Sequence, residues 1–220
     1  MLFSFFFFTN AQLMNEYKIN DLFSVRQGKQ MLNKNKQITN SQNDKGFLNS
    51  NVIKVLTMSS INFDNKTIEP DFFLDYVTNK ANDEDNFLSA DNYIINRVGK
   101  IKSVSLLDFV DFDFTETNVL ASNHFIVLTP RKIVLENLPL FHTLVDVALK
   151  DLMDKKITTK VQSVSVKEIQ NITISIPPEG FDTLTRMFME IYQPYLNSLK
   201  NLKFHKNLLE GFKNELNKKQ

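Results

Sequence analysis

Hydrophobic and polar positions follow two different rhythms along this chain, and the rhythm changes near residue 180. Upstream, short apolar runs alternate with polar turns, a pattern typical of β-strands bounded by loops. Four segments predict strands, the second of them as two strands joined by a glycine turn: residues 52–58, 92–102, 125–128 and 169–176. The chain therefore opens with a β-rich region of mixed polarity.

One helix is expected inside this β-rich region, over residues 139–153. Its apolar residues are spaced three and four apart, which places them on one face of a helix. They are Leu140, Leu144, Val147, Ala148 and Leu152. Strands combined with a segregated helix predict an α+β fold.

From Phe181 onward the apolar positions recur in alternating steps of three and four, interrupted by Ser198 and His205. Such a heptad series predicts a long helix that pairs with another helix, roughly 57 Å in length at 1.5 Å per residue. Pro194 is predicted to kink or divide this helix. The residues expected to form the pairing seam are Leu184, Phe188, Ile191, Tyr195, Leu202, Leu209, Phe212 and Leu216.

These patterns predict three regions: an apolar N-terminal extension at 1–14, a globular domain at 15–178 and a long helix at 179–220. The apolar run from Met1 to Phe8 has no preceding cationic residues and is too short to span a bilayer. It fits an incidental or mis-assigned extension, a processed leader or a packed terminal strand. We expect it to be dispensable.

Composition argues against an enzyme. The chain has no cysteine, which excludes thiol nucleophiles and cysteine-bound zinc and fits a cytoplasmic location, and its three histidines lack metal-ligand spacing. No nucleotide-binding, hydrolase or methyltransferase motif is present. The acidic groups around residues 83–85 and 108–116 are interpreted as solvated loops. We therefore expect no catalytic residues, metal or cofactor.

The net charge is only +1, so any DNA-binding surface has to be a local patch. Cations gather around two glycines: Arg26 and Lys29 flank Gly28, and Arg97, Lys100 and Lys102 surround Gly99. A glycine turn of this kind can present backbone N–H groups and positive charge to a phosphate. Ordinary turns with solvated cations fit the same pattern. Arg131 and Lys160 are further candidates.

The order of elements resembles the target-recognition domain of type I restriction-modification specificity subunits, from Tyr17 to Lys219. The matching features are the segment ending at Gly28, a strand like 52–58, the helix at 139–153 and a serine- and threonine-rich stretch over 158–169. The chain also carries an "apolar-x-apolar-Pro" strand before its long helix, and a "Leu…Asp-apolar-apolar…Arg-x-Gly" series at Leu88, Asp91, Ile94, Ile95, Arg97 and Gly99. It departs from the family in having Glu179-Gly180-Phe181 where Glu-Gln is usual, and in lacking a glycine before the serine-rich stretch.

The resemblance implies a non-catalytic half-subunit, with one recognition domain and one helix. Such a chain binds double-stranded DNA, recruits a methyltransferase subunit and, through the assembly, a restriction subunit. Two copies paired through their helices would read a symmetric, interrupted site whose spacing the helices set. The alternative is a coiled-coil interaction adaptor whose globular head binds protein, which the near-neutral charge favours. Salt-dependent DNA binding in the presence of the methyltransferase subunit separates the two.

Overall fold

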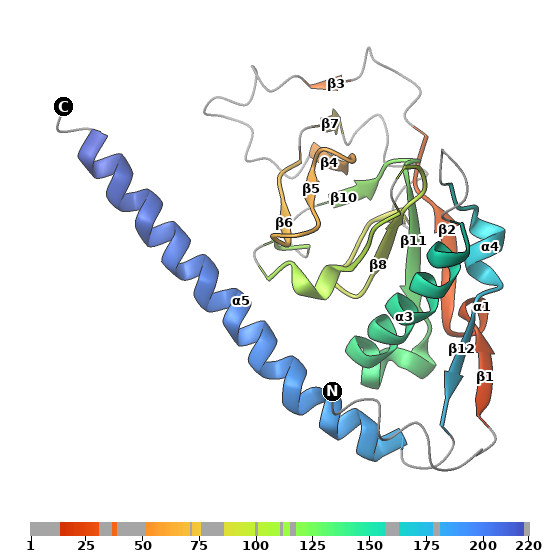
Figure 1. Cartoon of the computed structure of the whole chain (residues 1–220). Coiled ribbons are helices and arrows are strands. Elements are labelled where there is room, and N and C mark those ends of the chain that lie inside the picture. The colour runs from red at the N-terminus through yellow and green to blue at the C-terminus, as the bar shows by residue number, and fades with distance from the viewer. Residues whose placement is uncertain are drawn as a thin grey trace.

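The chain forms a β-rich head from which one long helix extends (Figure 1). The structure is a computed structural model, and it confirms the expected α+β class. It describes residues 14–30, 37–38, 52–70, 72–75, 86–99, 101–110, 112–114, 118–156, 163–177 and 181–217. The apolar run at 1–8, the acidic group at 83–85, Lys100 and Lys160 lie outside these residues.

The centre of the head is an antiparallel sheet of four strands in the order β2-β11-β8-β9. Residues alternate between the two faces of these strands, so that Tyr93 and Ile95 lie in one core while Ile94 lies in the other. Both faces are covered, which explains why β11 is almost continuously apolar. The strands are β2 (Phe23–Gln27), β8 (Tyr93–Asn96), β9 (Ser103–Ser105) and β11 (Phe125–Pro130).

The first face of this sheet is covered by helix α3 (Leu138–Lys156), which follows the short 3-10 segment η6 (Lys132–Asn137). Val145 and Leu149 of α3 are fully buried in the same core as Ile126 and Leu128 of β11. Burial of each of these side chains contributes about 1.5–3 kcal/mol. The predicted helix at 139–153 is therefore present, and Leu140 of its expected apolar face is buried. Val147 was expected on that face and is 59% exposed, because the buried face centres on Phe141, Val145 and Leu149.

The second face is covered by a mixed sheet in the order β10-β4-β7-β3. Val119 and Ala121 of β10 share a core with Phe125 and Val127 of β11. The strands are β3 (Gln37–Ile38), β4 (Val52–Leu56), β7 (Phe72–Asp75) and β10 (Asn118–Ala121). A hairpin of β5 (Ile61–Asn62) and β6 (Thr67–Ile68) adjoins them, and a 3-10 turn η5 (Leu106–Asp108) follows β9.

The first and last strands of the head pair with each other. β1 (Asn15–Lys18) runs antiparallel to β12 (Thr173–Ile176), with Asn15 opposite Ile176. The short helix α1 (Ile19–Leu22) then leads into β2, and the Ile19 amide donates to the Ile172 carbonyl at 2.9 Å.

Only part of the predicted strand at 169–176 is extended, because residues 166–170 form helix α4 (Val166–Gln170). A capping box starts this helix: the Glu168 amide donates to Ser165 Oγ at 3.2 Å, and the Ser165 amide donates to the Glu168 carboxylate at 2.8 Å. The cap favours helix at a segment whose apolar spacing also fits a strand.

Helix α5 (Phe181–Asn217) is one unbroken helix of 37 residues. Division at Pro194 is therefore wrong. Proline removes one backbone hydrogen bond of the helix, the one that would join position 194 to the Glu190 carbonyl. In the following turn, Ser198 Oγ donates to the Pro194 carbonyl at 2.9 Å. The proximal part of α5 lies against the head, and its distal part projects beyond it (Figure 1).

Candidate nucleic-acid interface

Gly28 lies where the end of β2 meets the β10–β11 turn, residues 122–124. Its amide donates to the Phe125 carbonyl at 2.9 Å, and the next amide, from Lys29, donates to the Ala121 carbonyl at 2.8 Å. A Cβ at position 28 would lie 2.1 Å from the Ser122 carbonyl oxygen. The glycine is therefore required by the close approach of two backbone segments.

Arg97 lies on the other side of the same turn. Its amide donates to the His124 carbonyl at 2.8 Å, and its guanidinium Nη1 donates to the Asn123 carbonyl at 3.1 Å. Its own carbonyl accepts from the Val164 amide at 3.0 Å, which ties the serine-rich stretch to the same place. Gly99 follows with a φ of 84°, the left-handed conformation that glycine adopts without strain.

Gly28, Lys29 and Arg97, from the two predicted glycine turns, thus meet the β10–β11 turn. The Asn123 carbonyl accepts from both Arg97 and the Gln27 side chain, the latter at 3.2 Å. His124 is exposed at the turn. Gln27, Asn123 and His124 were not among the candidates from the sequence. Their signal in the sequence is a short polar interruption at residues 122–124 between two mainly apolar strands.

Arg26 and Lys102 are engaged in other parts of the head. The Arg26 guanidinium donates to the Asn86 carbonyl at 2.7 Å, and burial lowers its pKa. Lys102 Nζ lies 3.6 Å from the Asp64 carboxylate and 5.7 Å from the ring centroid of Phe63. These contacts orient the Arg26 and Lys102 side chains toward neighbouring loops of the head.

Arg131 lies at the opposite end of the central sheet. In the register of β2 and β11, Ile126 faces Gln27 at the turn, whereas Pro130 faces Phe23 at the far end. The Arg131 guanidinium Nε donates to the Asn20 carbonyl at 3.2 Å. This arginine is therefore separated from the β10–β11 turn by the length of β11.

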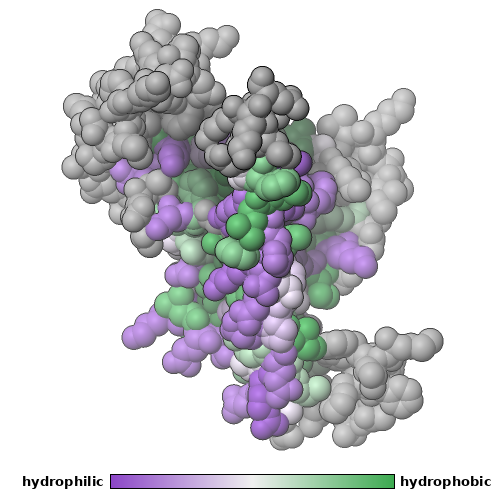
Figure 2. Space-filling view, turned by 90° about the vertical axis from the view of Figure 1, so that its left-hand side faces the viewer, coloured by the Kyte–Doolittle hydropathy of each residue, from purple (hydrophilic) through white to green (hydrophobic). Residues whose placement is uncertain are grey.

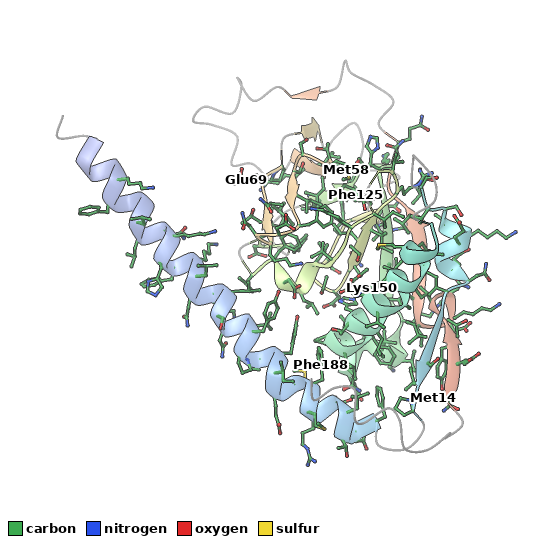
Figure 3. The ribbon with its side chains drawn as sticks, in the orientation of Figure 1. Met14, Met58, Glu69, Phe125, Lys150 and Phe188 are labelled. Carbon is green, nitrogen blue, oxygen red and sulfur yellow. The ribbon has the colours of Figure 1, made fainter. Side chains whose placement is uncertain are left out.

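The predicted pairing seam on α5 is divided between two environments. Leu184 and Phe188 are half-buried beside the head, and Phe188 stacks on Tyr192 with ring centroids 5.3 Å apart (Figure 3). Tyr195 is 38% exposed. Ile191, Leu202, Leu209 and Phe212 are exposed, and the Leu216 side chain lies outside the described residues. Figure 2 shows green, hydrophobic residues along this helix among purple, hydrophilic ones.

A serine–histidine pair, Ser105 and His142, lies in the hydrophobic core of the head. Ser105 Oγ is 2.7 Å from His142 Nδ1, and His142 is 2% exposed between the rings of Phe23 and Tyr93. Burial lowers the pKa of His142 to about 3, opposed by a hydrogen bond to the Asp91 backbone. The pair is closed to substrate and stabilises the packing of α3 on the sheet.

Among the described residues, no three His, Asp or Glu side chains are grouped so that they could hold a metal ion. No described helix combines the length and apolarity needed to cross a bilayer.

Comparison with known proteins identifies the family of this chain. The family model described as "Type I restriction modification DNA specificity domain" matches residues 12–214. A search of curated protein sequences finds no significant match.

Two solved structures share the fold. The S subunit from Thermoanaerobacter tengcongensis, HsdS, has a TM-score of 0.51 at 11% identity, over 88% of this chain and 41% of that one. A chain solved for the complex assembly and conformational transition of the type I R-M system has a TM-score of 0.52 at 12% identity, over 93% and 45%. The present chain spans less than half the length of these proteins. Because the family model covers nearly the whole chain, the protein belongs to the type I restriction modification DNA specificity domain family.

Proposed function

We propose that this chain is the sequence-specific DNA-recognition component of a type I restriction-modification complex, acting in the cytoplasm without catalysis of its own. The observation that carries the proposal is the convergence of the Gly28 and Arg97 segments on the β10–β11 turn, in a chain of this family. This convergence assembles a local basic and polar surface on a protein whose net charge is only +1.

Within this surface, Arg97 and His124 are the side chains best placed to meet DNA. Arg97 is half-buried and oriented by its bond to the Asn123 carbonyl, and the N–H groups of its guanidinium that remain can donate to a base edge or a phosphate. His124 is exposed beside it, and Lys29 adds positive charge on the β2 side of the turn. Lys100 and Lys160, outside the described residues, remain candidates from the sequence.

The distal half of α5 supports assembly with partner helices. Five apolar side chains there are 54–63% exposed: Leu202, Phe204, Leu208, Leu209 and Phe212. At 3.6 residues per turn they cover an arc of roughly 160°, wider than the seam of a two-stranded coiled coil. One side of this arc suits a second copy of the chain, and the other side suits the methyltransferase subunit.

The test is DNA binding by the chain assembled with its methyltransferase subunit, after the target has been identified by mapping methylated sites. Arg97→Ala and His124→Ala are compared with Arg131→Ala, which removes an arginine at the far end of β11. A lost phosphate contact lowers the salt slope by about one, whereas a lost base contact costs about 1–3 kcal/mol and relaxes one position of the target.

Thermal melting of each variant separates loss of contact from loss of fold. Unchanged affinity, salt slope and sequence preference in both Arg97→Ala and His124→Ala would remove the β10–β11 turn from the interface. No salt-dependent DNA binding by the assembled complex would refute DNA recognition itself and favour a protein-binding head.

A further inference from the structure

Asp108, at the end of η5, is the head residue that meets the middle of α5. Its side chain is 14% exposed. Burial raises its pKa, and attraction from Lys66 and a hydrogen bond from Tyr192 oppose that rise. A carboxylate that has lost most of its water is stabilised by donors from the protein.

Three donors from two other segments surround this carboxylate. Tyr192 Oη donates to Asp108 Oδ1 at 3.1 Å, and Tyr195 Oη donates to Oδ2 at 3.5 Å. Lys66 Nζ, from the turn of the β5–β6 hairpin, lies 3.8 Å from Oδ2. We call these four residues the Asp108 cluster. It joins α5 to η5 and to the hairpin at one point.

Two structural details restrict the residues of the Asp108 cluster. Lys66 has a φ of 54°, a left-handed backbone that is uncommon for residues other than glycine and persists only where the surroundings hold it. On the helix, the Phe188, Tyr192 and Tyr195 rings form a ladder with successive centroids 5.3 and 5.9 Å apart, which restricts both tyrosines. Burial raises the pKa of Tyr195 to about 12, so its hydroxyl remains a donor at neutral pH.

A second contact fixes the start of the same helix. The Phe181 ring lies 5.9 Å from Phe141 of α3. The two contacts are about 16 Å apart along the axis, since Tyr192 is eleven residues further on. A helix held at one point can swing, whereas a helix held at two points has a defined direction.

The part of α5 beyond Tyr192 acts as a lever. The helix continues from there to Asn217, roughly 37 Å at 1.5 Å per residue. A swing of about 10° would displace the far end by roughly 6 Å, which is close to two base-pair steps of 3.4 Å. Small changes in helix direction therefore change the distance between two heads paired through α5.

We propose that the Asp108 cluster is a positioning latch that fixes the direction of α5 relative to the head and thereby sets the spacing between the two DNA half-sites. The effect on half-site spacing rests on the proposed function, whereas the latch itself does not depend on it. Removal of the two tyrosine hydroxyls, as Tyr192→Phe with Tyr195→Phe, opens the latch while keeping the aromatic ladder. Tyr17→Phe removes the same group from β1 and is the matched control.

The first measurement is the distance between head and helix in the full chain. The sequence contains no cysteine, so Glu69→Cys and Lys206→Cys give two unique sites for spin labels, both exposed (Glu69 is labelled in Figure 3). Labelled chain is diluted with unlabelled chain so that only distances within one molecule are recorded. We expect a narrow distribution in the parent and in Tyr17→Phe, and a broadened one in the double Phe variant.

The second measurement uses the complex with the methyltransferase subunit and duplexes whose half-sites are moved apart by one or two base pairs. We expect the preference for the natural spacing to fall about tenfold or more in the double Phe variant, because this variant loses two hydrogen bonds to a charged group. Asp108→Asn should act in the same direction, and Tyr17→Phe should retain the parent preference.

The outcomes distinguish the two ideas. An unchanged distance distribution in the double Phe variant overturns the latch. A broadened distribution with an unchanged spacing preference overturns its role in half-site spacing. If the parent complex binds no duplex at any spacing, the proposed function fails and the effect on half-site spacing with it, while the label distances decide the latch independently.

Discussion

Replacement of Leu202 and Leu209 by Asp should convert a self-associating chain into a folded monomer. These side chains are 55% and 54% exposed in the single chain, so about half of each remains to be covered by a partner. Full burial of a leucine contributes about 1.5–3 kcal/mol, hence each half contributes about 0.75–1.5 kcal/mol. Two positions on each of two chains give about 3–6 kcal/mol, which weakens pairing by at least about a hundredfold.

Sedimentation or light scattering over a concentration series measures this effect, and circular dichroism checks that the helix and head remain folded. The matched control is Gln193→Asp with Asn207→Asp, which adds the same two charges to exposed positions of α5 outside the apolar arc. The reasoning is refuted if the parent chain is monomeric throughout, if the leucine variant keeps the parent mass, or if the control dissociates equally.

Two further changes test the head. Gly28→Ala should lower stability by about 1–3 kcal/mol, because its Cβ would lie 2.1 Å from the Ser122 carbonyl oxygen. Gly211→Ala, in α5, meets no atom within 4 Å and is the comparison in thermal melts. His142 should make the protein acid-sensitive, because its folded pKa of about 3 lies below the unfolded value of 6.5. The stability that neutral His142 contributes is therefore complete above pH 6.5 and is lost as the pH falls toward 3. His142→Gln should flatten this dependence of melting temperature on pH, whereas removal of the exposed His205 by His205→Gln should leave it unchanged.

The sequence predicted those elements whose hydrophobic period is long and unambiguous. The helix at 139–153 became α3, residues 92–102 became β8 and the turn that leads into β9 at Ser103, and the heptad series became α5. Each of these elements has its hydrophobic period encoded locally. Pro194 was overestimated as a breaker, because one lost hydrogen bond is small beside the other turns of a 37-residue helix.

What the sequence missed depends on contacts between distant segments. Asp108 and Tyr192 are 84 positions apart, and Asn123 meets Gln27 across 96 positions, so neither pairing leaves a local pattern. Helix α4 was missed for a different reason, since five residues with two apolar positions fit period two as well as period 3.6. The Ser165–Glu168 cap was visible in the sequence and would have decided the question.

The pairing of β1 with β12 makes the head a structural unit that can be exchanged as one continuous block of sequence. Because Asn15 lies opposite Ile176, the chain enters and leaves this unit at adjacent points, both at the side from which α5 departs. A gene rearrangement that replaces the DNA between these two points would supply a new reading surface to an unaltered scaffold. Exchange of this block would change the DNA sequence that is recognised. Single substitutions at the junction between the head and α5 would change the geometry of recognition, independently of that exchange.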